Sequence, residues 1–205
     1  MNYRDYKKFG QGEFYHVYNR GNNKEAIFLD GEDRKCFLFR TRESLYPEYA
    51  SPRRKPLPKD AFTLLCYCLM PNHFHFLVRQ NSQVPISELI KKICTGYSKY
   101  FNKRHERVGH VFQDQYKAIA VSQDHYLTWV SAYIHQNPKI AGLVNNLEEY
   151  PWSSYRDYLG LRQGKLCSVD LILGMFKDSR EYKNFIENSY EEIKVRKDIQ
   201  KLLLE

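Results

Sequence analysis

The pattern of apolar and polar positions predicts four β-strands within the first 121 residues. Side chains on a strand alternate between two faces, whereas apolar positions on a helix recur every three or four residues. Strand-like runs occupy residues 14–18, 62–69, 73–79 and 116–121. Only Met70-Pro71-Asn72 separates the second run from the third, so we expect these two strands to form an antiparallel hairpin.

Apolar residues at helical spacing predict three helices among and after these strands. The first opens at Asp30 or Glu32 and runs to residue 45, and the second starts near Pro85 and runs to about residue 104. The third begins at residue 123 or 124. We expect Pro138 to end it, because the residue before a proline is disfavoured in a helix.

The resulting order is β-α-β-β-α-β-α, and its first six elements match the ferredoxin-like split βαβ arrangement. We therefore predict an α+β fold with one antiparallel sheet and helices on one face. Helical stretches near 168–177 and 179–203 follow, and the second carries an apolar stripe suited to docking on the main domain or a partner. The predicted organisation is a domain of residues 1–155 and a C-terminal helical extension of residues 156–205.

Two histidines one residue apart, His73 and His75, are the most informative chemical feature. They project from one face of the third predicted strand, while Phe74 and Phe76 point to the other face. Neutral imidazoles bind divalent metals, and two ligands leave positions open for a third protein ligand, water and a phosphate oxygen. Taken alone, the pair is about equally well explained as two structural histidines.

A second polar cluster lies some 60 residues later, where Tyr133 and Asn137 share one face of the third predicted helix. A tyrosine hydroxyl is a weak nucleophile, but it can attack a phosphodiester polarised by a metal and form a phosphotyrosine link. Asn137 could complete the metal shell through its side-chain oxygen. Taken alone, Tyr133 is more often a core residue, and His135 between them is expected to serve packing.

The charge distribution favours a polyanionic partner. The chain has 205 residues and a net charge of +8, with +9 in residues 1–120 and −1 in residues 121–205. A localised positive field attracts nucleic acid, and 17 Tyr and 12 Phe offer flat surfaces for unpaired bases. A merely soluble basic protein remains the plainer alternative.

The cysteines and the N-terminal residues indicate a reduced, cytoplasmic protein. Five cysteines without paired CxxC spacing suggest neither a disulfide framework nor a zinc ribbon. The N-terminal residues lack an apolar leader segment, and no apolar run approaches membrane-spanning length. We therefore expect no membrane partner.

Four ordered blocks of sequence carry a family resemblance. They are Tyr15-His16-Val17-Tyr18-Asn19-Arg20-Gly21-Asn22, Cys68-Leu69-Met70-Pro71-Asn72-His73-Phe74-His75, Gly109-His110-Val111-Phe112-Gln113 and Tyr133-Ile134-His135-Gln136-Asn137-Pro138-Lys139-Ile140-Ala141-Gly142-Leu143-Val144. Together they resemble the single-tyrosine HUH transposases, which include the insertion sequence 200-like enzymes. The last block and the later Pro151-Trp152-Ser153-Ser154 look most like the REP-associated tyrosine transposase branch.

The resemblance implies a role for each matching residue. His73 and His75 would bind Mg²⁺ or Mn²⁺ with the help of Asn137, and Tyr133 would join to the 5′ phosphate of cleaved single-stranded DNA. Such proteins recognise imperfect DNA hairpins. We assign DNA contacts to a wider polar set: Arg20, Asn22, Lys99, Lys103, Arg104, Gln113 and Lys117.

Three functions remain open at this level. The first is a metal-dependent transposase that cleaves and rejoins single-stranded DNA at hairpins through Tyr133. The second is a domesticated hairpin-binding protein without transposition activity, and the third is a metal hydrolase that uses water and dispenses with Tyr133. The sequence is compatible with a monomer or a homodimer, and it leaves open whether Tyr133 serves its own subunit.

Overall fold

Four strands form one antiparallel sheet in the order β2-β3-β1-β4. The computed structural model describes residues 10–50, 52, 55–121 and 124–202. The strands are β1 (Phe14–Arg20), β2 (Phe62–Met70), β3 (His73–Gln80) and β4 (Lys117–Val121). This order confirms the predicted ferredoxin-like arrangement, because β1 lies between β3, the second strand of the hairpin, and β4.

Seven α-helices lie in the described chain. They are α1 (Gly31–Leu45), α2 (Ile86–Arg104), α3 (Asp124–Ile140), α4 (Tyr155–Tyr158), α5 (Asp170–Leu173), α6 (Ser179–Asn188) and α7 (Tyr190–Leu202). Three short 3-10 helices are η1 (Asn22–Lys24), η2 (Pro47–Tyr49) and η3 (Leu147–Glu149). Asp30 decides where α1 begins, since its carboxylate accepts hydrogen bonds from the backbone N–H groups of Glu32 and Asp33.

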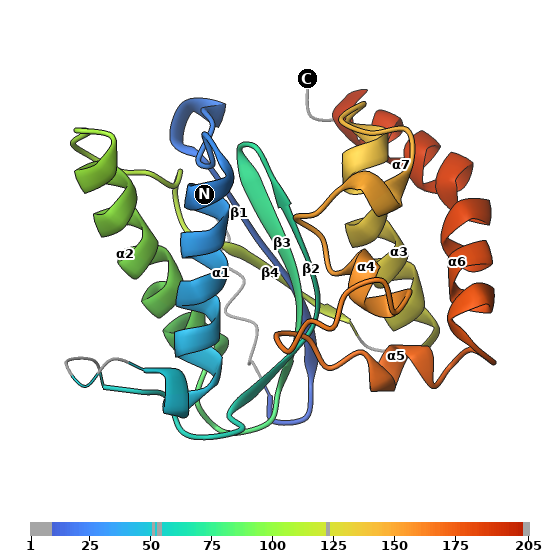
Figure 1. Cartoon of the computed structure of the whole chain (residues 1–205), viewed down its shortest axis with the longest axis horizontal. Coiled ribbons are helices and arrows are strands. Elements are labelled where there is room, and N and C mark those ends of the chain that lie inside the picture. Colours follow the sequence, from blue (N-terminus) through green and yellow to red (C-terminus); the bar gives the residue numbers. More distant parts are fainter. Residues whose placement is uncertain (1–9, 51, 53–54, 122–123, 203–205) are drawn as a thin grey trace, which may run out of the picture.

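Helices cover both faces of the sheet (Figure 1). Helices α1 and α2 pack on one face around Phe37, Phe74 and Tyr97, as predicted. The opposite face is covered by α3 and the C-terminal helices, where Leu77 and Ile134 belong to a second core. The prediction of helices on one face therefore holds for α1 and α2, and the structure adds a second helical layer.

Helix α3 continues through Pro138 to Ile140, so the prediction that Pro138 ends the helix was wrong. Proline has no N–H group and leaves the carbonyl of Ile134 without its usual helical donor. The side-chain amide of Asn137 donates to the carbonyl oxygens of Ile134, at 3.3 Å, and Tyr133, at 2.7 Å. This amide supplies the missing donor and allows the last turn to form.

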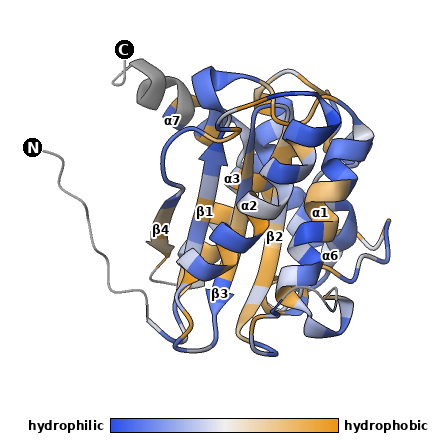
Figure 2. Cartoon of the chain, turned by 90° about the vertical axis from the view of Figure 1, so that its left-hand side faces the viewer, coloured by the Kyte–Doolittle hydropathy of each residue, from blue (hydrophilic) through white to orange (hydrophobic). Residues whose placement is uncertain are grey.

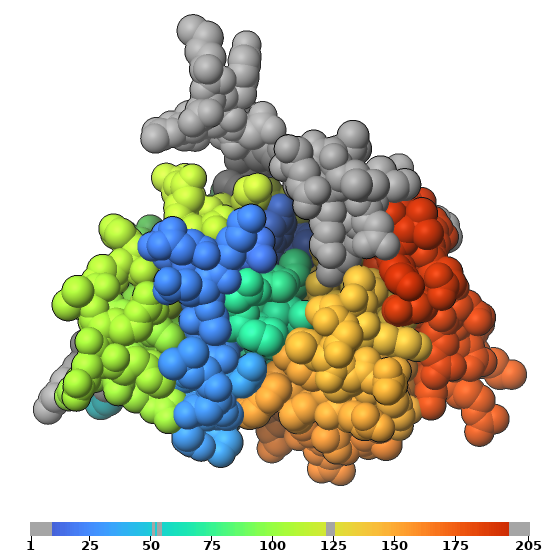
Figure 3. Space-filling model, turned by 90° about the horizontal axis from the view of Figure 1, so that it is seen from above, coloured from blue at the N-terminus to red at the C-terminus, as the bar shows by residue number. Residues whose placement is uncertain are grey.

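The C-terminal extension packs on α3 and shares its core. Tyr182, Ile186 and Ile193 are buried there, so the predicted apolar stripe docks on the main domain. The helix expected over 179–203 is broken at Ser189 into α6 and α7, and the one expected over 168–177 shrinks to α5. Figure 3 shows the residues beyond about 125 on the side of the molecule opposite α2. The boundary after residue 155 stays a prediction.

Burial of the strands fits their sequences. Eight of the nine residues of β2 are buried, and this strand is coloured largely hydrophobic in Figure 2. Cys66 and Cys68 lie together in the core of the α3 face, and all five cysteines are free thiols. Among the described residues, no helix combines the length and apolar character needed to cross a membrane.

Candidate active site

Pairing of β1 with β3 places five polar side chains on the sheet face that α3 covers. The register sets Tyr18 opposite His75 and Arg20 opposite His73. His16 lies two residues before Tyr18 and therefore on the same face. Phe74 and Phe76 point into the other core, so the alternation predicted for β3 is observed.

Helix α3 lays Tyr133 against this group of rings. The ring centroid of Tyr133 lies 5.7 Å from that of His75 and 5.6 Å from that of His16, and both contacts are edge-to-face. The rings of His73 and His75 are 4.9 Å apart. The structure thus brings the histidine pair and the tyrosine together, although about 60 residues separate them.

The side chain of Asn72 fixes the orientation of His73. Asn72 donates from Nδ2 to the carbonyl of Lys24 at 2.9 Å, so its Oδ1 faces Nδ1 of His73 at 2.6 Å. An amide oxygen can only accept, and Nδ1 of His73 must therefore carry the proton. Nε2 then keeps the lone pair with which a neutral imidazole binds a metal.

His16 is placed to do the same for His75. Nε2 of His16 lies 2.9 Å from Nδ1 of His75, and both side chains are buried. One of the two nitrogens donates the proton. When His75 donates from Nδ1, its Nε2 has a lone pair, which matches His73.

The residues present fit a divalent cation held by two histidines and an oxygen ligand. In the described part of the chain, no group of three His, Cys, Asp or Glu side chains could hold a metal. An amide oxygen is a further ligand that a hard divalent cation accepts. Asn137 is fully buried one turn after Tyr133, and its Nδ2 faces helix carbonyls, so Oδ1 is the atom that could bind a cation.

Burial raises the pKa of Tyr133 to about 12, and the neighbouring Tyr18 hydroxyl adds to the effect. Burial also raises the pKa of Tyr18. The Tyr133 phenol is consequently protonated at neutral pH. Any attack by this oxygen must lose a proton, which requires a polarising or accepting group beside it.

Three of the predicted DNA-contact residues meet at the end of β1. The N–H of Gln113 donates to the carbonyl of Arg20, and the N–H of Asn22 donates to the carbonyl of Val111, both at 2.9 Å. Gly21 permits the tight turn between them, because a Cβ there would collide with the carbonyl oxygen of Glu25. Lys117, on β4, lies opposite Tyr18 and is exposed. Arg20 lies opposite His73 and Lys117 opposite Tyr18, so these two residues share the sheet face of the Tyr133 site.

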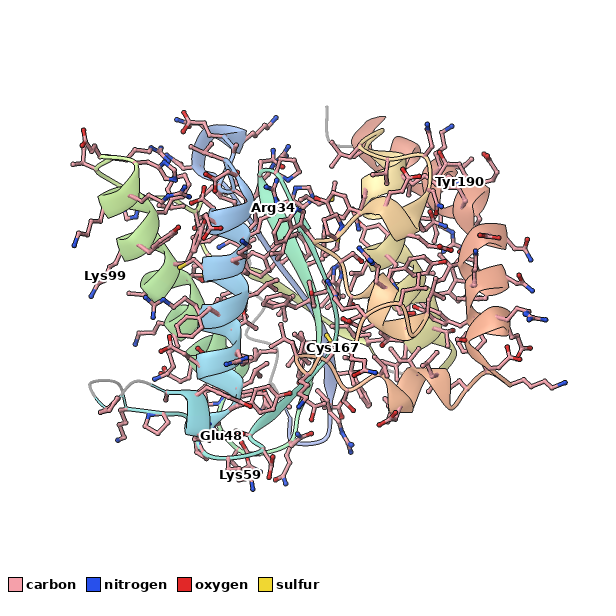
Figure 4. All side chains as sticks on the ribbon, viewed as in Figure 1. Arg34, Glu48, Lys59, Lys99, Cys167 and Tyr190 are labelled. Atoms are coloured by element: carbon pink, nitrogen blue, oxygen red, sulfur yellow. The ribbon has the colours of Figure 1, made fainter. Side chains whose placement is uncertain are left out.

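The predicted contacts on α2 lie elsewhere. Helix α2 packs on the sheet face opposite α3, and Figure 4 labels Lys99 at the far side of the molecule from Tyr190 on α7. Lys99 borders a separate groove of about 430 Å³, and Lys103 is exposed at the end of the same helix. Arg104 binds Asp30 and Asp33 at 2.6 Å each, so it joins α2 to α1.

His135 is a structural residue, as expected. It is fully buried, with Nδ1 at 2.8 Å from the Tyr182 hydroxyl and Nε2 at 2.9 Å from the Ser154 hydroxyl. Burial lowers the pKa of His135 to about 3. The neutral ring connects α3 to α6 and to the segment before α4.

The sequence-based prediction gave three residues, His16, Tyr18 and Asn72, no place in the candidate site. His16 and Tyr18 repeat the i, i+2 spacing of His73 and His75, which is the signal that could have found them. The spacing alone did not suffice, because it does not say which strand lies beside β3.

Known proteins resemble this chain in sequence and in fold. The fold and the site define a class of protein: it has a ferredoxin-like sheet, a histidine pair on one strand and a tyrosine on the helix that covers that strand. Residues 40–137 match the family model described as transposase IS200 like. His73, His75, Tyr133 and Asn137 all lie within the matched range. The resemblance inferred from sequence is confirmed.

Solved structures share the fold at low sequence identity. One is a REP-associated tyrosine transposase bound to a REP hairpin, with TM-score 0.57 and 16% identity over 83% of this chain and 90% of that chain. Another is a proposed transposase from Deinococcus radiodurans, with TM-score 0.41 and 16% identity over 63% of this chain and 96% of that one. A search of curated proteins finds no match.

Proposed function

We propose that this protein is a metal-dependent transposase that cleaves and rejoins single-stranded DNA at hairpin sites through a covalent 5′-phosphotyrosine at Tyr133. The observation that carries the proposal is the contact of the Tyr133 ring with His75 and His16 on one sheet face. The match of residues 40–137 to the IS200-like transposase family model supports DNA strand transfer. The hairpin bound to the structural neighbour supports a hairpin DNA partner.

In the proposed reaction Oη of Tyr133 forms a bond to the scissile phosphorus, and the bond from phosphorus to the 3′ oxygen breaks. The phenolic proton leaves, and the departing 3′ oxygen takes up a proton. His73, His75 and Asn137 would hold Mg²⁺ or Mn²⁺, which when bound polarises the phosphate as a Lewis acid. Attack by a 3′ hydroxyl on the phosphotyrosine then frees Tyr133 and rejoins the strand.

Asn72 and His16 serve the proposed site as positioning residues. Each contacts Nδ1 of a histidine that would hold the metal, which turns Nε2 toward the cation. Arg20, Asn22, Gln113 and Lys117 would contact the DNA from the border of the site. We place the protein in the cytoplasm, which the five free thiols support.

The test is a denaturation-resistant adduct between the protein and hairpin DNA that carries a single-stranded flank. With Mg²⁺ or Mn²⁺, wild-type protein should form the adduct, and Tyr133→Phe or a chelator should abolish it. The phenylalanine keeps the ring and removes only the nucleophilic oxygen. Cleavage by Tyr133→Phe without an adduct would instead indicate a hydrolase that uses water.

A domesticated hairpin-binding protein is the remaining alternative. It would bind the same DNA in a salt-sensitive manner and show neither cleavage nor adduct with any divalent cation. The same experiment therefore distinguishes it from the proposed transposase.

A further inference from the structure

Helix α7 of the C-terminal extension forms one wall of a groove beside Tyr133. Helix α3 supplies the other wall, and the groove holds about 410 Å³. Its lining residues are Tyr126, Trp129, Val130, Tyr133, Glu192, Ile193 and Arg196. This volume falls within the range of sites for small organic groups, roughly 300–1,000 Å³.

The groove presents flat aromatic surface and a guanidinium group. Tyr126 is 59% exposed, whereas the next residue on α3, Leu127, is buried. The Trp129 ring meets Phe185 edge-to-face at 5.7 Å, which holds its orientation, and Arg196 lies 5.8 Å from the Trp129 centroid. Aromatic rings combined with arginine are the surfaces on which unpaired bases stack.

The charges in the groove favour a base over a phosphate. Arg196 forms an ion pair with Glu192 at 2.6 Å, so the cation is balanced inside the groove. A carboxylate on the wall would repel a phosphate group, whereas a neutral base with a π face suits the mixture of aromatic, aliphatic and paired charged groups. The bases of a duplex are paired and stacked, so they do not present a single base that can enter the groove.

We propose that this groove binds one unstacked nucleobase of the single-stranded DNA next to the scissile phosphate. The inference rests on the proposed function, which puts that phosphate at Tyr133. It gives residues 156–205 a role in DNA recognition, because α7 supplies Arg196 and Ile193 to the groove. The base would stack on Trp129 or Tyr126, and Arg196 would cover its edge.

The experiment measures tryptophan fluorescence and binding affinity in the Tyr133→Phe background, where the DNA cannot be cleaved through this oxygen. One DNA is a hairpin with a single-stranded flank, and the other is the same hairpin without the flank. The flanked hairpin should quench fluorescence, the bare hairpin should not, and Trp129→Phe should remove the quenching. This variant assigns the signal to Trp129, since the chain has only 2 tryptophans.

Two further variants test the walls of the groove against matched controls. Tyr126→Ala and Arg196→Ala should each weaken binding of the flanked hairpin about tenfold and leave the bare hairpin unaffected. Phe39→Ala removes an aromatic side chain that is 46% exposed on α1, and Arg180→Ala removes an exposed arginine at the start of α6. Both controls should bind the flanked hairpin as the parent does.

The outcomes separate this inference from the proposed function. Equal quenching by both DNAs, or equal affinity of Tyr126→Ala and Phe39→Ala for the flanked hairpin, would overturn the groove proposal. If wild-type protein forms the adduct in that case, the proposed function still stands. Flank-dependent quenching without any wild-type adduct would retain the groove and overturn the proposed chemistry.

Discussion

The two faces of the sheet differ in what their side chains do, although the same strands supply both. On the α1 and α2 face, β3 contributes Phe74 and Phe76 to a core that they share with Phe37 and Tyr97. On the α3 face, the same strand contributes His73 and His75 beside Tyr133. The period of two along one strand therefore separates apolar core side chains from the polar side chains of the candidate site within a stretch of four residues.

This separation explains why imidazole groups can be buried on the α3 face of the sheet, which we call the polar face. Burying an unpaired polar group is costly, but Asn72 and His16 provide hydrogen-bond partners for the two histidines. The apolar face anchors the strand, so the histidines do not have to stabilise the fold. Substitution of a histidine on β3 should accordingly lower the activity, whereas substitution of the adjacent phenylalanine should lower the stability of the fold.

The largest expected effect is the loss of chemistry in His75→Ala. If His75 holds the metal, adduct formation should fall on the order of a thousandfold, because the Lewis acid contributes several kcal/mol to transition-state stabilisation. The rate of adduct formation is measured as adduct yield against time at a fixed Mn²⁺ concentration, and circular dichroism verifies that the variant is folded. A folded His75→Ala protein with wild-type adduct yield would contradict the assignment of this ligand.

The next effect is the loss of stability in Phe76→Ala, one residue along the strand. Phe76 is fully buried, and truncation should lower the free energy of unfolding by roughly 3–5 kcal/mol through lost burial and a cavity. Adduct formation per folded molecule should stay near the wild-type rate. Urea titration gives the stability, and a loss of activity in the fully folded fraction would show that the two faces are not separable.

Sequence patterns predicted which side chains of β3 share a face of the sheet. They did not predict which residues of other strands lie beside them. Alternation in β3 is a property of neighbouring residues, so it put His73 and His75 on one face and Phe74 on the other. The position of Tyr18 opposite His75 depends on the order β2-β3-β1-β4, which no local pattern specifies. The candidate site was therefore predicted without His16 and Tyr18.

The helix boundaries were missed for a related reason. A proline rule based on backbone sterics ended α3 too early, because the Asn137 amide replaces the donor that Pro138 lacks. The break between α6 and α7 at Ser189 could not be predicted from the sequence pattern, because the apolar stripe continues at helical spacing on both sides of it. In both places a particular side-chain contact or tertiary packing decides the outcome.

A smaller effect should come from His16, which joins β1 to the polar face. His16→Phe keeps a ring but removes the acceptor for Nδ1 of His75, and loss of such a partner should weaken metal binding about 10- to 100-fold. His16→Gln can restore an acceptor and should recover part of the affinity. Calorimetric titration with Mn²⁺ measures both variants, and equal affinities for wild type and His16→Phe would exclude a positioning role.

The smallest expected effect concerns His135, the neutral histidine on the α3 face. Burial lowers the pKa of His135 to about 3, whereas an unfolded histidine titrates near 6.5, so between these values the unfolded state binds more protons than the folded one. The stability that this group contributes is present above pH 6.5 and is lost as the pH falls, by at most roughly 1.4 kcal/mol per pH unit. Urea titrations of wild type and His135→Gln between pH 4 and 7 should show a shallower dependence in the variant. Every other titrating group is common to both proteins. Parallel curves would therefore mean that His135 accepts a proton in the folded state, and that water reaches it between α3 and α6.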